Sequence, residues 1–510
     1  MRPALPLGAL VRGHTCVRTT TSITTFRRPL ATMAPGLVDG AAAPASLPIA
    51  AGMAAAPVAA PTKSSSHVMH RHLGVMPLKA IRAEGCYIYG ENRRFLDACG
   101  GAAVVSVGHG DKRMIAALTE QLNSVNYVHS GNWATDCSEE LAEVLCAEAN
   151  ERGGDFARAY FALGGSEAVE SAVKLARQHF VEKGELQRTN FIGRDQGFNG
   201  NTLGCLALGG HKGRRKHFEP MLASGAFHKV SPCYAYRHQK EGESEAEYVA
   251  RLETELEAKF QELGPETVAA FCAETVVGAT TGCVPAVKGY FQACRRVCDR
   301  HGALFILDEV MSGMGRTGTL HAWEQEGVIP DIFTVAKGIS GGYAPLSAVL
   351  ASRKVIEPIE RGSKVFVSGF TFQSYSCGTR AGLEVQKILK SDRLVERCAE
   401  MGVFLEAELH RCLDDHPNVG NIRGRGLFWG VEFVADKGTK EPFSPKVGLS
   451  SRVVDDAISK GVVMYTGSGT ADGVAGDHIL ICPPYTITRE QLTEVVETLR
   501  AALDDVLAQI

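Results

Sequence analysis

Short apolar runs bounded by turn residues are the most informative pattern along this chain. Two of them, Leu304–Leu307 and Ile332–Ala336, are rich in aliphatic and β-branched residues. Runs of this kind predict buried strands of a parallel sheet. The first run leads into Asp308 and the second into Lys337. Because open α/β sheets bind ligands at the carboxyl ends of their strands, we expect these two ionisable side chains at one binding edge.

The other periodicities predict an alternation of strands and helices between 159 and 350, which is typical of a parallel sheet with crossover helices. Two alternating runs at 86–89 and 94–98 predict a β-hairpin outside that sheet. We therefore predict an α/β fold with a large domain over 112–371 and a smaller α+β domain that combines 67–111 with 372–510. Helical spacing is found at 112–123, 139–149, 168–176, 241–263, 290–301, 376–389, 395–413 and 489–508. Further strands are expected at 159–162, between 191 and Gly197, at 268–277 and on both sides of 423–426.

Composition removes several classes of function. The 510 residues allow two or three domains of about 150 residues each. A net charge of −3 argues against a nucleic-acid partner, and no apolar run reaches the roughly 18 residues of a membrane span. The 15 cysteines are scattered without a CxxC pair, so we expect free thiols and no metal site.

The first 32 residues are rich in arginine, serine and threonine, and no acidic residue precedes Asp39. This composition predicts a mitochondrial transit peptide over 1–32, although an unstructured tail with chance arginines has the same appearance. Met33 could serve as a second start and yield a cytoplasmic form. The Ala-, Pro- and Ser-rich segment 33–66 is expected to be a disordered linker.

Two glycine-containing segments follow predicted strands. Gly164-Gly165-Ser166 opens a helix, where free amides and the helix dipole favour an anion such as a phosphate. The segment is neither GxGxxG nor a P-loop, and strand–Gly–Gly–Ser is also a common way to begin a helix. In Gly197-Phe198-Asn199-Gly200, the aromatic side chain either covers a flat ring or packs a turn.

A buried lysine and a nearby aspartate together indicate one cofactor. Desolvation lowers the pKa of a lysine such as Lys337 and suits it to Schiff-base chemistry. Asp308 could hold a pyridinium nitrogen protonated, as pyridoxal phosphate requires. Either residue alone could be a surface lysine or a helix cap, but both together with the glycine-rich segment favour pyridoxal 5'-phosphate.

The stretch LDEVMSGMGRTG, followed by TVAKGISGGYAP, resembles the class III (omega-type, subgroup II) pyridoxal-phosphate-dependent aminotransferases of fold type I. The resemblance extends from about His67 to the C-terminus. It implies a large domain with a mostly parallel, seven-stranded sheet and a homodimer with shared active sites. It also implies ping-pong transfer of an amino group from a small-molecule amino acid or amine donor to a 2-oxo acid.

The resemblance assigns a role to each matching residue. Lys337 would form the Schiff base and then act as general base and acid, and Asp308 would pair with the pyridine nitrogen. Arg423 would take a substrate carboxylate, and Thr371 would reach the phosphate of the neighbouring subunit's cofactor. The remaining cofactor-binding residues are Gly165 and Ser166 at the phosphate, Val310 and Phe198 on the two ring faces, Asn199 next to Phe198, and Glu274.

Some positions depart from the family pattern. The phosphate loop has one hydroxyl fewer than Ser-Gly-Ser, and Asn199 replaces the motif histidine. Val277 occupies the position of a glutamine in the family pattern. Ala279 occupies the position of the glutamate that neutralises the carboxylate-binding arginine. An arginine without that partner is less easily masked, which argues against ornithine and γ-aminobutyrate transaminases. β-Alanine–pyruvate-like, amine–pyruvate-like and dialkylglycine-like reactions stay open, as do decarboxylation-dependent transamination, an aminomutase reaction, racemisation and a non-catalytic interaction protein.

Overall fold

The computed structural model describes residues 66–510. The predicted import leader 1–32, the second start at Met33 and the linker up to residue 65 lie outside the described residues. Within the described part of the chain, no helix is both long and apolar enough to span a membrane.

The predicted seven-stranded sheet is confirmed, and its strand order is β4-β12-β11-β10-β7-β5-β6. Every strand runs in the same direction except β12, which is antiparallel to both of its neighbours. The strands are β4 (Phe156–Ala162), β5 (Asn190–Arg194), β6 (Phe227–Val230), β7 (Val268–Glu274), β10 (Leu304–Asp308), β11 (Ile332–Val335) and β12 (Ser347–Ser352). Since β10 and β11 are parallel neighbours, the residues that follow them meet at one edge of the sheet.

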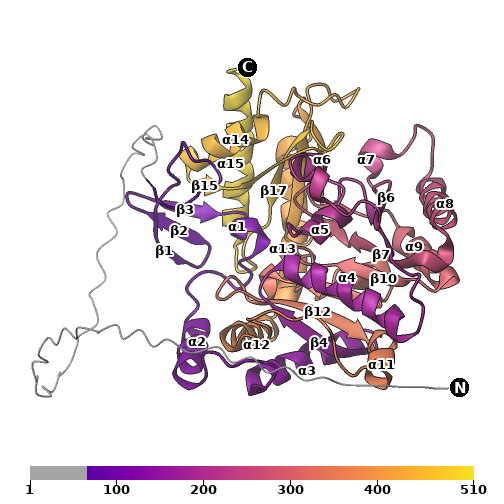
Figure 1. Cartoon of the computed structure of the whole chain (residues 1–510). Coiled ribbons are helices and arrows are strands. Elements are labelled where there is room, and N and C mark those ends of the chain that lie inside the picture. Colours follow the sequence, from indigo (N-terminus) through magenta and orange to yellow (C-terminus); the bar gives the residue numbers. More distant parts are fainter. Residues whose placement is uncertain (1–65) are drawn as a thin grey trace, which may run out of the picture. The chain divides into compact units, whose positions relative to one another are not determined.

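Helices cover both faces of this sheet, as the continuous apolar runs require. Along β10, Leu304 and Ile306 face one helical layer, whereas Phe305 and Leu307 face the other. The first layer contains α4 (Gly165–Glu182), which crosses in front of the sheet in Figure 1, and α11 (Arg353–Arg361). The second layer contains α3 (Asp136–Glu151), α8 (Glu245–Leu263) and α9 (Tyr290–His301).

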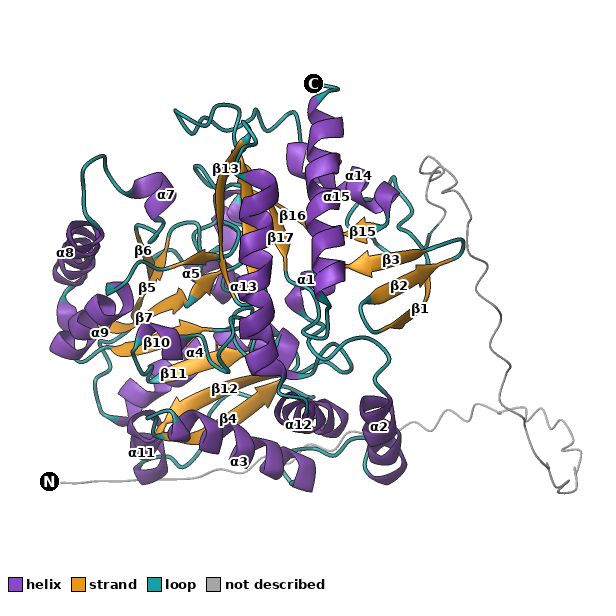
Figure 2. Cartoon of the chain, turned by 180° about the vertical axis from the view of Figure 1, so that it is seen from behind, coloured by secondary structure: helices purple, strands orange, loops and turns teal. Residues whose placement is uncertain are grey.

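A second hydrophobic core lies between C-terminal helices and an antiparallel sheet of order β13-β14-β17-β16. In Figure 2, α13 and α15 run side by side in this part of the chain. The sheet consists of β13 (Val419–Arg425), β14 (Phe428–Phe433), β16 (Tyr465–Ser468) and β17 (Asp477–Ile481), and the helices are α13 (Leu394–Leu413), α14 (Leu449–Lys460) and α15 (Arg489–Leu507).

The N-terminal strands β1 (Ala80–Glu84), β2 (Tyr87–Gly90) and β3 (Arg94–Asp97) form a third sheet with β15 (Val462–Val463). β3 pairs in parallel with β15, so an N-terminal strand and a C-terminal strand share one sheet. The predicted small domain requires such a contact, because it combines 67–111 with 372–510. The shorter or connecting elements are α1 (Gly100–Ala103), α2 (Lys112–Ser124), α5 (Leu203–Leu208), α6 (Lys212–Arg215), α7 (Ala235–His238), β8 (Val276–Val277), β9 (Val284–Pro285), α10 (Trp323–Glu326) and α12 (Ser376–Ser391).

Several predicted elements have different bounds in the structure, and two of these differences have a clear local cause. The strand expected over 268–277 ends at Glu274, because β8 turns away and pairs with β9 instead of continuing the sheet. The helix expected from 241 begins at Glu245, because Ser244 caps it. The Ser244 hydroxyl accepts from the amide of Glu247, and the Glu247 carboxylate accepts from the amide of Ser244.

Candidate active site

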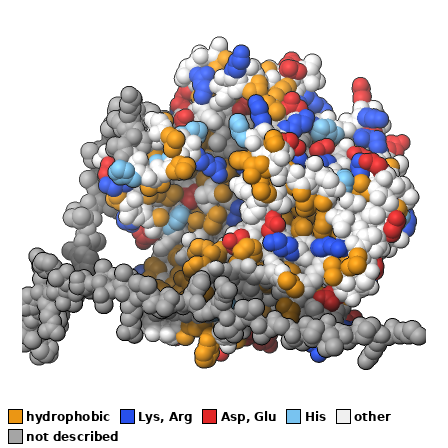
Figure 3. Space-filling view, viewed as in Figure 1, with side chains coloured by type: hydrophobic (Ala, Val, Ile, Leu, Met, Phe, Trp, Pro, Cys, Tyr) orange, Lys and Arg blue, Asp and Glu red, His pale blue; other side chains and the backbone are white. Residues whose placement is uncertain are grey.

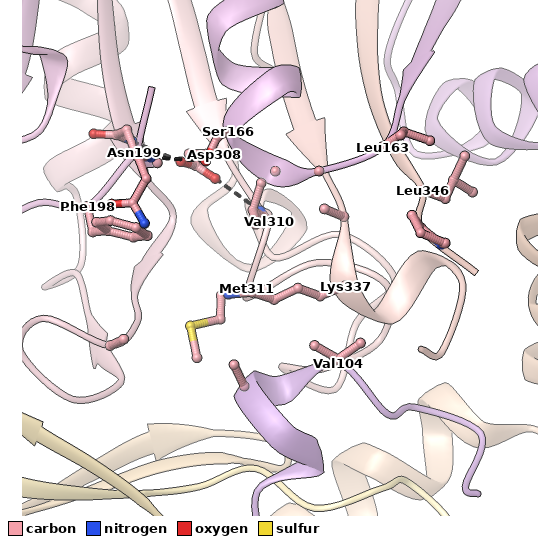
Figure 4. A pocket seen from close by; sticks show the side chains of 18 of the residues that line it. Val104, Leu163, Ser166, Phe198, Asn199, Asp308, Val310, Met311, Lys337 and Leu346 are labelled. Atoms are coloured by element: carbon pink, nitrogen blue, oxygen red, sulfur yellow. Dashed lines mark hydrogen bonds between the residues drawn. The ribbon is translucent and has the colours of Figure 1, made fainter. Parts of the chain in front are cut away.

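A cavity of about 570 Å³ lies at the carboxyl ends of β10 and β11 (Figure 4). The structure brings eight of the ten predicted site residues into its lining and leaves Thr371 and Arg423 outside it. The predicted residues in the lining are Gly165, Ser166, Phe198, Asn199, Glu274, Asp308, Val310 and Lys337. Among residues 66–510, no three His, Cys, Asp or Glu side chains are grouped so that they could hold a metal ion.

Asp308, the last residue of β10, is held by hydrogen bonds on both carboxylate oxygens. The Asn199 side-chain amide donates to Oδ2 across 2.8 Å, and the Val310 amide donates to Oδ1 across 3.0 Å. Burial raises the pKa of Asp308, while these donors and the Lys337 ammonium oppose the rise. The carboxylate is therefore fixed in orientation and faces the cavity (Figure 4).

Lys337 opens a short 3-10 turn that one residue separates from the end of β11, and its side chain extends into the same cavity. Its backbone has a φ of 50°, a left-handed conformation that is uncommon for residues other than glycine and is often found at functional sites. Burial lowers the pKa of the Lys337 ammonium, although Asp308 and Glu274 oppose this shift. A larger share of the amine is thus unprotonated near neutral pH, as a nucleophile or base requires.

The amino end of α4 forms the glycine-lined wall of the cavity. Gly165 begins the helix, and a Cβ atom built on it would lie 2.6 Å from Cγ1 of Val310. A residue with a Cβ atom at this position would therefore force Val310 or the start of α4 to shift. The Ser166 hydroxyl accepts from the amide of Asn201 across 3.0 Å. Within residues 66–510, no protein acceptor takes the amide N–H groups of Gly165 and Ser166, which leaves them available for an anion.

Glu274 connects two loops that line the cavity. One carboxylate oxygen accepts from the Phe198 amide and the other from the Gly278 amide, each across 2.9 Å. Burial and the nearby Asp308 raise the pKa of Glu274 to about 7. Glu274 therefore holds the Phe198 loop against the end of β7.

Thr371 is exposed and lies outside the main cavity. It lines a separate hollow with Phe370, Gln373 and residues His129–Gly131. The backbone carbonyl of Thr371 accepts from the Tyr127 hydroxyl across 2.9 Å. Within one chain, Thr371 thus does not contribute to the lining around Lys337.

The expectation that Arg423 lacks a masking partner is wrong. Arg423 is buried, and its Nη1 lies 2.9 Å from Oε2 of Glu432. The remaining donors bind the carbonyls of Gly282 and Thr281 and the Asn421 side chain. Glu432 lies on β14, the strand paired with β13, so the register between two strands supplies the counter-charge that Ala279 does not.

Sequence reasoning missed Arg71 and Arg214, which both line the cavity. Arg214 lies on α6, and its guanidinium carbon is 4.5 Å from the centroid of the Phe198 ring. Its charge adds to the lowering of the Lys337 pKa. The sequence signal was the basic run KGRR at 212–215, which lies 14 to 17 residues after Phe198 and outside the quoted motifs.

Comparison with known proteins agrees with this geometry. A sequence profile described as "Aminotransferase class-III" matches residues 68–503. An uncharacterised aminotransferase of Schizosaccharomyces pombe is 49% identical over 435 residues, which are 85% of this chain and 94% of the relative. A chloroplastic gamma aminobutyrate transaminase 3 of Solanum lycopersicum is 34% identical over 84% of this chain and 81% of the relative.

Solved structures show the same fold. An amine transaminase from an uncultivated Pseudomonas species, in its PLP-bound internal aldimine form, superposes with a TM-score of 0.80 at 31% identity, covering 88% of this chain and 99% of that one. The omega transaminase of Pseudomonas jessenii in complex with PMP superposes with a TM-score of 0.79 at 32% identity, covering 85% of this chain and 94% of that one.

Proposed function

Because the chain belongs to the class III aminotransferases, which use pyridoxal 5'-phosphate, we propose that Lys337 is its cofactor-binding and proton-transferring residue. The observation that carries this proposal is the shared cavity of Lys337 and Asp308 at the ends of two adjacent parallel strands. A buried amine with a lowered pKa and a fixed carboxylate are the two groups that this chemistry needs from a protein.

The residues of the cavity fit the cofactor in each of its parts. Asp308 would pair with the ring nitrogen, and Val310 and Phe198 would cover the two faces of the ring. Gly165 and Ser166 would take the phosphate through free amides and a hydroxyl, at a position where a Cβ atom would collide with Val310. When bound, the cofactor supplies a carbonyl carbon that takes up nitrogen and a ring that accepts an electron pair.

Lys337 would have two tasks in succession. Its amine would hold the cofactor covalently until a substrate amine displaces it. Once free, the amine would take the proton from the substrate Cα and deliver it to the cofactor side, as general base and then general acid. The lowered pKa of Lys337 favours the first of these tasks because it leaves the amine unprotonated.

Thr371 supports a homodimer in which each subunit completes the partner's site. Its side chain is exposed in the single chain, and Phe372 and Val367 beside it are exposed apolar residues, with 45% and 80% of their surface accessible. Apolar side chains also lie among charged ones on the face drawn in Figure 3. Sedimentation of the purified protein should give twice the mass of one chain, and a monomer at micromolar concentration would refute this arrangement.

We propose that the protein is imported into mitochondria, because residues 1–32 are rich in arginine. A relative in Oryza sativa subsp. indica, 32% identical, carries the name "Probable gamma-aminobutyrate transaminase 3, mitochondrial". A fluorescent fusion of the full chain should enter mitochondria, and a fusion that starts at Met33 should stay in the cytoplasm. Equal distribution of the two fusions would contradict this location.

The experiment for the catalytic proposal combines a spectrum with a substrate panel. Purified protein should absorb in the visible through its lysine-bound cofactor, and Lys337→Ala should lose that band. Donors should include β-alanine, γ-aminobutyrate, ornithine, aromatic amines and 2,2-dialkylglycines, with pyruvate or 2-oxoglutarate as acceptor. Release of carbon dioxide would indicate decarboxylation-dependent transamination instead, and a product isomeric with the donor would indicate an aminomutase.

A further inference from the structure

Arg214 lines the cavity and carries a guanidinium that is available to bind a ligand. Within the described chain its side chain makes no hydrogen bond or ion pair, and its guanidinium lies over the Phe198 ring at 4.5 Å. An arginine whose only contact is with an aromatic ring keeps all five of its N–H donors available for hydrogen bonds. Arg214 can therefore present a bidentate edge to an anion without first breaking a contact.

The neighbouring Arg215 fixes the helix that carries Arg214. Its Nη1 donates to the carbonyls of Leu206, Ala207 and Gly209, and its other nitrogens pair with Glu219. The amide of Arg214 itself donates to the His211 ring. With the backbone of α6 held in this way, Arg214 starts from a defined position beside the cavity, which lowers the entropy cost of binding.

Arg423, the competing cation, is committed to protein groups. Each of its side-chain nitrogens has an acceptor, and Glu432 neutralises its charge. Glu432 in turn accepts from Arg237 across 2.8 Å and from the Tyr234 hydroxyl. Releasing Arg423 toward a substrate would remove one of the two arginines that pair with the buried Glu432 carboxylate, and it would take a donor from two backbone carbonyls, which is costly in a low dielectric.

Several other residues of the cavity lining are apolar. They include Ala102, Val104, Val276, Ala279 and Met311. Apolar side chains do not solvate a carboxylate, so an anionic substrate needs a cation from another part of the lining. Besides Lys337, the cations available in the described lining are Arg214 and Arg71, and Arg71 lies exposed at the rim.

We propose that Arg214, rather than Arg423, binds the carboxylate of the amino donor and of the 2-oxo acid. This inference rests on the proposed function, because it names the carboxylate-binding group of the same cavity. It places the carboxylate beside Phe198 and leaves the apolar residues of the lining for the remainder of the substrate. Arg214 thereby sets specificity for carboxylate-bearing substrates over simple amines and aldehydes.

The test measures binding separately from turnover. Propionate, a carboxylate that cannot react, is titrated into the cofactor-loaded enzyme by calorimetry. Arg214→Gln should weaken propionate binding at least tenfold, whereas Lys212→Gln, which removes a charge from the same helix outside the cavity, should leave it unchanged. Arg423→Lys and Arg71→Gln should retain it within about twofold. Loss of binding in either of these two variants but not in Arg214→Gln would overturn the proposal.

A kinetic comparison adds a second readout. The aminated enzyme is mixed with pyruvate or with propanal, which lacks the carboxylate, and the cofactor absorbance is followed. Arg214→Gln should slow the reaction with pyruvate at least tenfold more than the reaction with propanal. Equal slowing of both would indicate a structural role and refute the proposal. If no acceptor reacts with any variant, the aminotransfer proposal fails, while the propionate titration still decides the role of Arg214.

Discussion

The side-chain amide of Asn199 donates a hydrogen bond to Oδ2 of Asp308 across 2.8 Å, although the two residues are 109 positions apart in the chain. The Val310 amide holds the other oxygen of the same carboxylate. A neutral amide thus holds the carboxylate from the position at which the family motif has a histidine. It fixes the carboxylate without adding a titrating group near the cofactor ring.

Asn199→Ala should lower activity by about ten- to hundredfold, since a hydrogen bond to a charged group contributes roughly 1.5–3 kcal/mol. The thermal unfolding temperature should change little, because Asp308 keeps its Val310 and Thr334 donors. Asn199→His is the matched variant and should retain most of the activity. Steady-state kinetics at saturating cofactor would check this, and wild-type rates in Asn199→Ala would contradict it.

Gly165→Ala should weaken cofactor affinity at least tenfold. The new Cβ would lie 2.6 Å from Cγ1 of Val310, so the amino end of α4 or the end of β10 must shift. Gly164→Ala is a close control, because a Cβ on Gly164 meets nothing within 4 Å and its φ of −126° suits any residue. Titration of the cofactor-free proteins with pyridoxal 5'-phosphate would measure both. Equal affinities in the two variants would show that the cofactor phosphate does not bind at Gly165.

Glu309 should make stability fall as pH rises from about 5 to 8. Burial raises the pKa of Glu309 to about 8, from 4.5 for an exposed glutamate. In that window the folded state keeps a proton that the unfolded state has released, so the free energy of unfolding decreases with pH. Relative to wild type, Glu309→Gln should therefore gain on the order of 1 kcal/mol per pH unit.

Urea unfolding of both proteins at pH 5.5, 6.5 and 7.5 would measure this trend. Glu266→Gln, a change on the exposed surface, serves as the control for removing one carboxylate. A constant difference between Glu309→Gln and wild type across the three pH values would show that Glu309 is ionised in the folded state throughout.

Glu432→Gln should destabilise the fold by roughly 3 kcal/mol, because it removes the counter-charge of the buried Arg423. Burial alone would raise the pKa of Glu432, but Arg423 and Arg237 outweigh it and lower the pKa. The stabilisation is therefore complete above the unfolded pKa of about 4.5 and lost as the pH falls through the lowered folded value. Denaturant unfolding at pH 7 would check the magnitude, and a change below about 0.5 kcal/mol would show that the pair contributes nothing.

Thr371→Ala and Lys337→Ala should complement each other when co-expressed. If each site takes Lys337 from one subunit and Thr371 from the other, a mixed dimer contains one intact site and one doubly altered site. Activity at limiting cofactor should then exceed that of either variant alone. The mixture would show no gain if both residues served the same subunit's site.

Much of the catalytic edge could be predicted because its signals are local. Asp308 and Lys337 each follow an apolar run directly, and the Gly164–Ser166 segment opens a helix. Parallel strands flanked by helices on both faces place such residues at one edge whatever the loops between them do. The strand order and the pairing of β3 with β15 needed the structure, because neither follows from local spacing.

The sequence by itself therefore determined the fold class, the cofactor and the residues that follow its strands and glycine turns. Only the tertiary structure decided which charged side chains are paired within the protein and which can bind a ligand. The register that pairs Asn421 with Glu432 across β13 and β14 gives Arg423 its partner, and the anchoring of α6 places Arg214 over Phe198. Hydrophobic periodicity specifies which face of an element is buried, whereas ion pairs between distant elements depend on register and rotamer, which that periodicity does not encode.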